Sequence, residues 1–370
     1  MTATMPDALE AAPKTSAAHR RRPTAGHSIR VIALFVILAV GLLVAVVVAA
    51  GRGQVDIPAN QVLGSLLHHL GIDAGTMPAA PQGDNTLWQV RFPRVVMAIC
   101  VGGSLATAGA LMQGVFGNPL AEPAVVGVST GAALAAAVVI VFDLAFLGSW
   151  TTAAFAFAGG LAATLLVYAM SREGGRTEVV TLVLTGIAVN AITSAGMALM
   201  MFLGNTDARE EIVFWTLGSL NGSQWRYVAV AGSLGVLGLV GASLLSRQLD
   251  LLALGDRAAR HVGVHVERLR LTAILLVAVL TAAAVAFAGI IGFVGLVVPH
   301  LVRMIAGPSH RVLIPASALG GALLLVVADL GARTLVTAAD LPIGMLTALV
   351  GGPFFFWLLR RTRRTSGGWA

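Results

Sequence analysis

The stretch that decides the fold of this chain is Gly289-Ile-Ile-Gly-Phe-Val-Gly-Leu-Val-Val-Pro-His-Leu-Val-Arg303. It is apolar enough to lie in a bilayer, but its three glycines and its proline would weaken an ordinary spanning helix. Glycine and proline are tolerated in such a segment where neighbouring helices satisfy the backbone or where irregular backbone lines a cavity. The stretch therefore predicts interrupted backbone within a helical membrane protein.

A second interruption is Gly117-Asn-Pro-Leu-Ala-Glu-Pro123, which separates two apolar runs. Across the chain, 57% of residues are hydrophobic and only 11% are charged, against about 25% charged in a soluble domain. Runs near the roughly 20 residues that cross a bilayer predict an all-α polytopic membrane protein. The ten predicted spans are 31–50, 95–113, 124–141, 152–170, 179–203, 228–245, 271–288, 291–304, 312–331 and 342–359. The region after residue 288 could form one element or two.

The basic residues predict the orientation. With the N-terminus inside, 18 of the 24 Lys and Arg residues fall in cytoplasmic segments and 6 in outer ones, as the positive-inside rule requires. We therefore expect a multi-pass protein of the cell (plasma or inner) membrane with both termini cytoplasmic. Residues 1–28 are expected to be a disordered cytoplasmic tail, and residues 29–365 the transmembrane domain.

Several function classes are disfavoured by what the chain lacks. The basic charges are spread over loops rather than clustered, which argues against nucleic-acid binding. The sole lysine, Lys14, follows a proline, so no P-loop exists. No His-Glu-x-x-His zinc-protease motif occurs, and the single cysteine, Cys100, cannot form a thiol metal cluster. We expect no enzyme activity, no metal site and no cofactor in this chain; ATP-driven work would need another polypeptide.

Seven motifs occur in order between about Arg91 and Arg360. They are Arg91-Phe-Pro-Arg94, Asn118-Pro-Leu120, Trp215-x-x-Gly-Ser-Leu220, the Leu254–Val264 segment, Gly289–Arg303, Ala328-Asp-x-x-Ala-Arg333 and the Pro342–Phe355 segment. Their order and spacing resemble the FecCD/BtuC-like permease subunits of binding-protein-dependent ABC importers for iron chelates, heme or cobalamin. One departure is Ser309, where an aspartate is expected. The resemblance implies a type II importer permease that pairs with itself or a paralogous permease. It also implies an ABC ATPase dimer that carries ATP and Mg, and an extracytoplasmic substrate-binding protein.

A short cytoplasmic helix is predicted at about 251–265, with Asp256 as its N-cap and Gly263 as its stop. Ala258, Ala259 and Val262 form a small apolar stripe, which also fits a simple interfacial connector. The resemblance implies instead a coupling helix that docks into the ATPase. The residues that match its pattern are Leu254, Gly255, Asp256, Ala259, Gly263 and Val264.

Six arginines are expected on the outer side against the charge bias, and three of them stand out. Snorkelling to lipid headgroups would explain isolated ones, but Arg91, Arg94 and Arg333 could form a basic docking rim. The resemblance implies that they meet acidic residues on the two lobes of the binding protein. Asp329 lies well inside an apolar run, and pairing with Arg333, one turn later, is its simplest explanation.

The translocation pathway is less marked in the sequence. Small residues four apart near Gly109, and again before Asn190, favour close helix packing. The resemblance implies that the fifth helix and the Asn-Pro-Leu segment line the pathway and its gate, which assigns Asn118, Leu120 and, on the fifth helix, Asn190 to it. Met197, Met200 and Met201 could offer a soft surface to a large planar ligand, or could simply fill gaps.

Together these features predict half of a membrane channel that imports an iron complex, with heme slightly favoured over ferric siderophore. The alternative is an ion-coupled secondary transporter with broken helices, which would require ionisable residues near the midplane and an internal repeat. A membrane scaffold would not need the coupling pattern.

Overall fold

A computed structural model describes residues 25–53, 55–174, 176–336 and 339–365. The first helix begins at Ala25, so residues 25–28, which were assigned to the tail, are helical. The reason is that this segment continues the helical run of residues 31–50 without a proline, and its one glycine, Gly26, lies in the first turn. The rest of the predicted tail lies outside the described residues.

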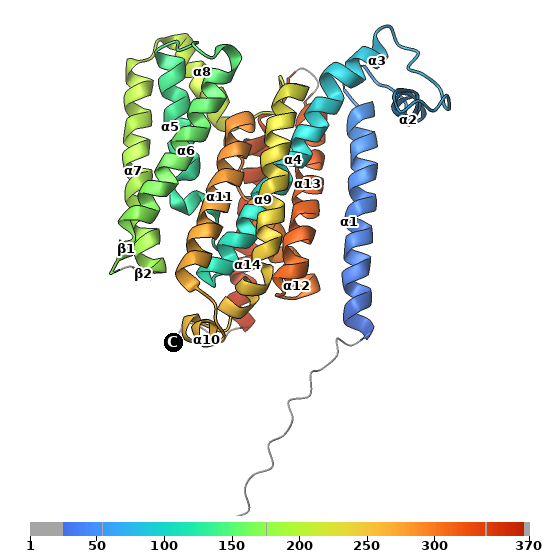
Figure 1. The fold of residues 1–370 in the computed structure, drawn as a ribbon. Coiled ribbons are helices and arrows are strands. Elements are labelled where there is room, and N and C mark those ends of the chain that lie inside the picture. The colour runs from blue at the N-terminus through green and yellow to red at the C-terminus, as the bar shows by residue number, and fades with distance from the viewer. Residues whose placement is uncertain (1–24, 54, 175, 337–338, 366–370) are drawn as a thin grey trace, which may run out of the picture.

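Ten main helices match the ten predicted spans one for one, which confirms the all-α prediction. Seven of them are long and apolar enough to cross a membrane, and three are shorter apolar helices. Figure 1 shows them running side by side, with the start of α1 and the end of α14 at the same lower end of the bundle. They are α1 (Ala25–Gly51), α4 (Phe92–Phe116), α5 (Val128–Val141), α6 (Thr151–Met170), α7 (Val179–Leu203), α9 (Trp225–Leu252), α11 (Val266–Ala288), α12 (Val294–Ala306), α13 (His310–Thr334) and α14 (Ile343–Thr365).

Short elements cover the two ends of the bundle. At the upper end lie α2 (Ala59–His69), α3 (Gly83–Thr86) and α8 (Thr206–Leu217), and at the lower end lies α10 (Asp256–His261). A two-residue antiparallel hairpin, β1 (Arg172–Glu173) with β2 (Arg176–Thr177), joins α6 to α7. Three further short helices are present in the described residues. Leu87–Arg91 is a π-helical segment that leads into α4, and Pro123–Val126 and Gly148–Trp150 are 3₁₀ turns.

Helix α4 forms the centre of the larger helix group and packs against α9, α11, α12 and α13. Two glycine contacts permit this. A Cβ on Gly102 would overlap the carbonyl oxygen of Gly321 in α13, and a Cβ on Gly109 would overlap that of Gly295 in α12. Small residues let helix backbones approach closely in a membrane, where van der Waals packing rather than water expulsion drives association.

Other helices flank this centre on two sides. Helices α5, α6 and α7 form one side, with α8 above them, and α1 stands at the opposite edge against α13 (Figure 1). The outward face of α1 carries exposed large apolar side chains, including Ile32, Ile37, Val40 and Val44. Such a face is stable in lipid and would be costly in water.

The Gly289–Arg303 stretch is interrupted as predicted, and it forms two elements. Helix α11 ends at Ala288, Gly289 adopts φ 68°, Phe293 adopts φ 67°, and α12 begins at Val294. The amide of Ser219 donates to the Ala288 carbonyl at 2.9 Å, and the amide of Ile343 donates to the Gly218 carbonyl at 3.0 Å. The Trp215–Leu220 motif therefore closes the broken region from above.

Pro299, inside α12, cannot donate to the carbonyl oxygen of Gly295 four residues earlier. The Gln113 side chain of α4 supplies donors instead, with its Nε2 3.5 Å from Gly295 O and 3.2 Å from Leu296 O. The buried Gln113 amide thus donates to the carbonyl that Pro299 leaves without a helical partner. Such a partner is needed because no water reaches the backbone in hydrocarbon.

We predict opposite outcomes for two neighbouring glycines. Gly102→Ala should destabilise the protein by about 1–3 kcal/mol because α4 and α13 must move apart. Gly103→Ala gains the same helix propensity, but its nearest atom, Ala318 O, would lie 3.4 Å away, so its stability should be unchanged or slightly higher. Thermal unfolding in detergent measures both, and equal melting temperatures would contradict the close-packing account.

Candidate functional site

The end of the bundle opposite α10 holds a cluster of arginines that face inward. Arg91 is only 5% exposed. Its Nη1 donates to Ala50 O at 2.7 Å and to Gly51 O at 3.0 Å, and its Nη2 donates to Val55 O. The last carbonyls of a helix have no partners within it and carry partial negative charge. Arg91 therefore caps the end of α1.

Asp329 lies at the centre of this cluster. It is 1% exposed, and each of its oxygens accepts a separate guanidinium: Oδ1 from Arg94 Nε at 2.9 Å, and Oδ2 from Arg333 Nε at 3.1 Å. Arg94 also contacts Asp340 at 2.7 Å. The predicted pairing of Asp329 with Arg333 is confirmed, and Arg94 is a second partner that the sequence analysis did not identify.

Arg333 adds a further bond between helices. Its Nη1 donates to Arg52 O and its Nη2 to Ala49 O, both at 3.1 Å. The snorkelling alternative is therefore wrong, because these guanidinium groups are buried and bound within the chain. Charges at this depth are stable only when they are paired.

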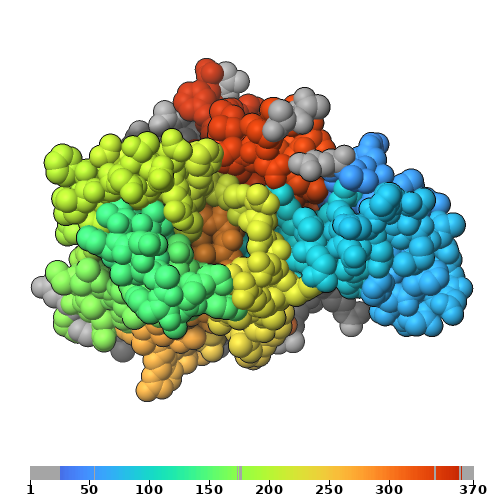
Figure 2. Space-filling view, turned by 90° about the horizontal axis from the view of Figure 1, so that it is seen from above, coloured from blue at the N-terminus to red at the C-terminus, as the bar shows by residue number. Residues whose placement is uncertain are grey.

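The same arginines line a cavity of about 580 Å³ at this end of the bundle. Asn221 and Asp340 also contribute to it. Figure 2 shows this end, where the segment that precedes α4 (cyan) meets the end of α13 (red); a separate hollow lies between the region of α8 and α9. Contact with a binding protein stays a prediction, now for a cavity wall rather than an exposed rim.

At the opposite end, the predicted coupling segment forms the short helix α10. Gly263, at φ 88°, ends it: Val264 N donates to Ala259 O and Gly263 N to Arg260 O, both at 3.0 Å. This pair of bonds is the Schellman motif, so the predicted stop is confirmed. The predicted N-cap is wrong, because Gly255 occupies that position and Asp256 is the first helical residue.

The Asp256 carboxylate instead forms an ion pair with Arg270 of α11, whose Nη2 donates to Oδ1 at 3.0 Å. Arg270 is buried, and its Nη1 donates to the Thr177 carbonyl at 3.0 Å. Thr177 N in turn donates to Glu267 Oε2 at 3.0 Å. One arginine thus connects α10 to α11 and to the α6–α7 hairpin, although the sequence analysis counted it only toward the charge bias.

Of the six predicted coupling residues, Asp256 is half-buried, and the other five divide into two groups. Leu254 is 70% exposed, and Gly255 and Gly263 are also exposed, whereas Ala259 and Val264 are buried against the chain itself. Val262, in the predicted apolar stripe, is exposed as well. The segment therefore presents a small apolar surface while its base is fixed.

The predicted gate segment lies between α4 and α5. Asn118 is exposed, and its Oδ1 accepts from Leu120 N at 2.9 Å, so the asparagine stabilises the turn; Leu120 is half-buried. Beside it, Arg303 Nη2 donates to Gln113 Oε1 at 3.1 Å. Glu122, which ends the same motif, accepts from Phe293 N at 3.1 Å at the start of α12. Glu122, to which no role was assigned from the sequence, therefore connects the two interrupted segments.

A second contact missed from the sequence joins α9 to α13. Asp250 Oδ1 accepts from His310 N at 2.7 Å and lies 2.7 Å from His310 Nδ1. Ser309, the departure from the expected aspartate, donates through Oγ to Asp250 Oδ2 at 3.3 Å. Asp250 thus supplies a carboxylate to this loop.

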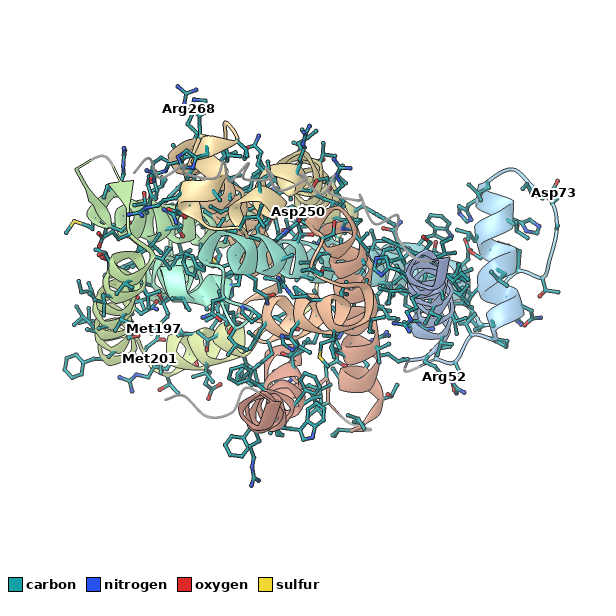
Figure 3. All side chains as sticks on the ribbon, turned by 90° about the horizontal axis from the view of Figure 1, so that it is seen from below. Arg52, Asp73, Met197, Met201, Asp250 and Arg268 are labelled. Atoms are coloured by element: carbon teal, nitrogen blue, oxygen red, sulfur yellow. The ribbon has the colours of Figure 1, made fainter. Side chains whose placement is uncertain are left out.

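The proposed pathway residues of α7 have packing roles in this structure. Asn190 Oδ1 accepts from Thr130 Oγ1 at 2.6 Å, which joins α7 to α5. Met200 is buried with Ala137 and Ile212, and Met197 and Met201, on neighbouring turns of α7 (Figure 3), pack against that cluster. A ligand-facing role for Met200 is therefore wrong. Close packing of α5 against α7 and α8 leaves the thioether no open surface, so it fills a gap.

The comparisons with known proteins agree with this architecture. The model of the FecCD transport family matches residues 41–361. The chain belongs to this family. It is 41% identical to the hemin transport system permease protein HmuU of Yersinia pestis, over 82% of this chain and 95% of that relative. It is 43% identical to the cobalamin import system permease protein BtuC of Halobacterium salinarum, over 73% and 72% of the two chains.

A solved structure of the same architecture, an inward-facing conformation of a metal-chelate type ABC transporter, superposes with a TM-score of 0.78. It is 31% identical to this chain and covers 89% of it and 99% of its own length. As a FecCD family member, the chain is a multi-pass membrane permease of an ABC importer, and the ATPase of such importers is a separate subunit. The ion-coupled alternative is therefore set aside.

The two aspartates of the outer cluster should respond differently to neutralisation. Asp329→Asn leaves Arg333 without a carboxylate partner and Arg94 with Asp340 alone, and should cost about 3–5 kcal/mol of stability. Asp340 is 43% exposed in its side chain, so Asp340→Asn should cost about 1 kcal/mol or less. Thermal unfolding of the purified variants measures the difference, and similar losses would show that Asp329 is not the centre of the cluster.

Proposed function

We propose that this chain is the permease half of an importer that moves heme into the cytoplasm. Two copies, or this chain and a paralogous permease, would enclose the pathway, and an ATPase dimer would drive it. The observation that carries the proposal is the coupling segment: Leu254 and Gly255 before α10 and Val262 after it are exposed, while Asp256 and Arg270 fix α10 to α11. An exposed apolar element on a rigid base is suited to transmit movement from a docked partner.

The orientation follows from the same segment. Helix α10, the start of α1 and the end of α14 lie at one end of the bundle (Figure 1). The positive-inside distribution makes this end cytoplasmic. The cavity lined by Arg91, Arg94 and Arg333 would then face the binding protein.

The pathway between two copies would be lined by the face of α7 that its own chain leaves open. Leu184, Ile187, Leu199 and Phe202 are exposed along it. Asn118 and Leu120 would border the pathway at its cytoplasmic end, where Gln113 and Arg303 hold the neighbouring helices together.

Heme is favoured over ferric siderophore and cobalamin for two reasons. The Gly289–Arg303 stretch resembles heme permeases more than siderophore permeases. The hemin relative also matches over 95% of its length, whereas the cobalamin relative matches over 72% despite slightly higher identity.

ATP-dependent uptake in proteoliposomes tests the substrate. The permease would be co-expressed with the ATPase and binding protein encoded beside it, and heme, a ferric siderophore and cobalamin would be compared. We expect heme uptake that requires both ATP and the binding protein, and that stops when the P-loop lysine of the ATPase is replaced. Uptake of only the siderophore or cobalamin would disprove the heme assignment, and uptake without an ATPase would disprove the importer.

Docking through α10 can be tested separately. Leu254→Glu places a charge on an exposed side chain that has no role in the chain's own packing, so folding should be retained while ATPase co-purification falls about tenfold or more. Met170→Glu is the matched control, because Met170 is also exposed and lies at the same end of the bundle, on α6. Equal ATPase retention by the two variants would rule out Leu254 as a docking residue.

A further inference from the structure

A groove outside the proposed machinery lies between the lower ends of α9 and α11. It encloses about 490 Å³ and is lined by Leu245, Arg247 and Gln248 of α9 and by His265, Arg268 and Thr272 of α11. Higher up, α9 and α11 are in close contact, because Gly238 and Gly241 accommodate Leu280 and Leu276. No glycine follows Gly241 in α9, and the groove begins one turn later at Leu245.

The groove is basic, and its charges are free. Arg247, Arg268 and His265 are exposed, and within the described residues their side chains make no hydrogen bond or ion pair. In contrast, the buried arginines Arg94 and Arg270 both have carboxylate partners. Figure 3 shows Arg268 projecting from the edge of the molecule, away from Asp250.

No carboxylate lines the groove. The two nearest in sequence are occupied elsewhere: Glu267 by Arg270 and Arg260, and Asp250 by His310. The groove also lies at the N-terminus of α11, a 23-residue helix whose first turn carries partial positive charge. The electrostatics of the groove therefore favour an anion.

The apolar surface above the groove indicates what kind of anion. Leu237, Val240 and Leu244 of α9 are exposed, and their spacing of three and four residues continues to Arg247. On α11, exposed Leu275 lies above Thr272 and Arg268 in the same way. The face is apolar at bilayer depth and cationic at the interface. It therefore fits a lipid whose acyl chains lie along the apolar part and whose phosphate headgroup binds the cationic part, as in basic pockets between membrane helices.

We propose that this groove is a binding site for an anionic phospholipid in the leaflet at the α10 end. Arg247 and Arg268 bind the headgroup phosphate, His265 donates a further hydrogen bond, and the acyl chains lie along Leu237, Val240 and Leu244. Val262, Gly263 and Val264 form part of the wall, so a bound lipid also contacts the turn that ends α10. The site goes beyond the proposed import function and does not depend on it.

Native mass spectrometry of the full-length chain in detergent tests the proposal. The protein would be titrated with phosphatidylglycerol, with phosphatidylcholine and, separately, with inorganic phosphate. We expect preferential retention of phosphatidylglycerol, and about 30-fold weaker binding of it to the Arg247→Gln/Arg268→Gln variant. Added salt should weaken the wild-type interaction, because it screens exposed charges.

The matched control is Arg30→Gln/Arg311→Gln, which removes two exposed charges at the same end of the bundle but outside the groove. It should bind phosphatidylglycerol as the wild type does. Arg247→Lys/Arg268→Lys should keep most of the binding, which would separate loss of charge from misfolding; unchanged melting temperatures for all variants are expected.

Three results would overturn the proposal. Equal loss in the two glutamine variants would indicate a general surface-charge effect. Binding of inorganic phosphate as tight as that of phosphatidylglycerol would indicate a soluble anion. Unchanged lipid binding with loss of ATPase co-purification in the Arg247→Gln/Arg268→Gln variant would assign the groove to partner docking.

Discussion

The structure depends on one constraint: a backbone polar group in hydrocarbon must have a partner, because water cannot supply one. Continuous helices meet this requirement by themselves, so the informative places are those where a helix ends or breaks. At the end of α1, Arg91 and Arg333 bind the carbonyls of residues 49–52. At Pro299 the donor is Gln113. Between α11 and α12, Ser219 and Glu122 bind the free backbone groups.

These partners also determine how the helices are connected. Each comes from a part of the chain distant in sequence, so satisfying a broken backbone joins two helices at the same time. Glu122 connects the Asn118–Pro123 break to the Gly289–Phe293 break. Both interrupted segments are therefore held in one arrangement, and a movement of α12 must involve the segment that follows α4.

Charge is organised in a related way at the two ends of the bundle. Asp329 forms ion pairs with Arg94 and Arg333 at the end opposite α10. Arg270 forms ion pairs with Asp256 and Glu267 at the α10 end. A buried ion is stable only with its partner, and removing one member is more costly than the pair is favourable. Such clusters make each end rigid. A rigid end can carry an exposed element such as Leu254 without losing its position.

Several predicted site residues changed role for this reason. The sequence identified Arg91, Arg94 and Arg333 as unusual, since outer arginines oppose the charge bias, but it could not show whether they face a partner or the chain itself. Asp256 was predicted to cap α10, because a carboxylate at a helix start usually does; Arg270, 14 residues later, attracts it more strongly. Met200 could meet a ligand only if no other helix packed against its side chain, but α5 and α8 pack against it.

The sequence by itself determined the membrane environment, the ten helices, the two interruptions and the helix stop at Gly263. These follow from local properties: hydropathy over about 20 residues, the backbone freedom of glycine and the missing amide of proline. Only the tertiary structure decided which charges are buried together, which carbonyls the arginines cap and which arginines stay free between α9 and α11. Those outcomes depend on contacts between residues up to 284 positions apart, and no local pattern encodes which distant side chain arrives.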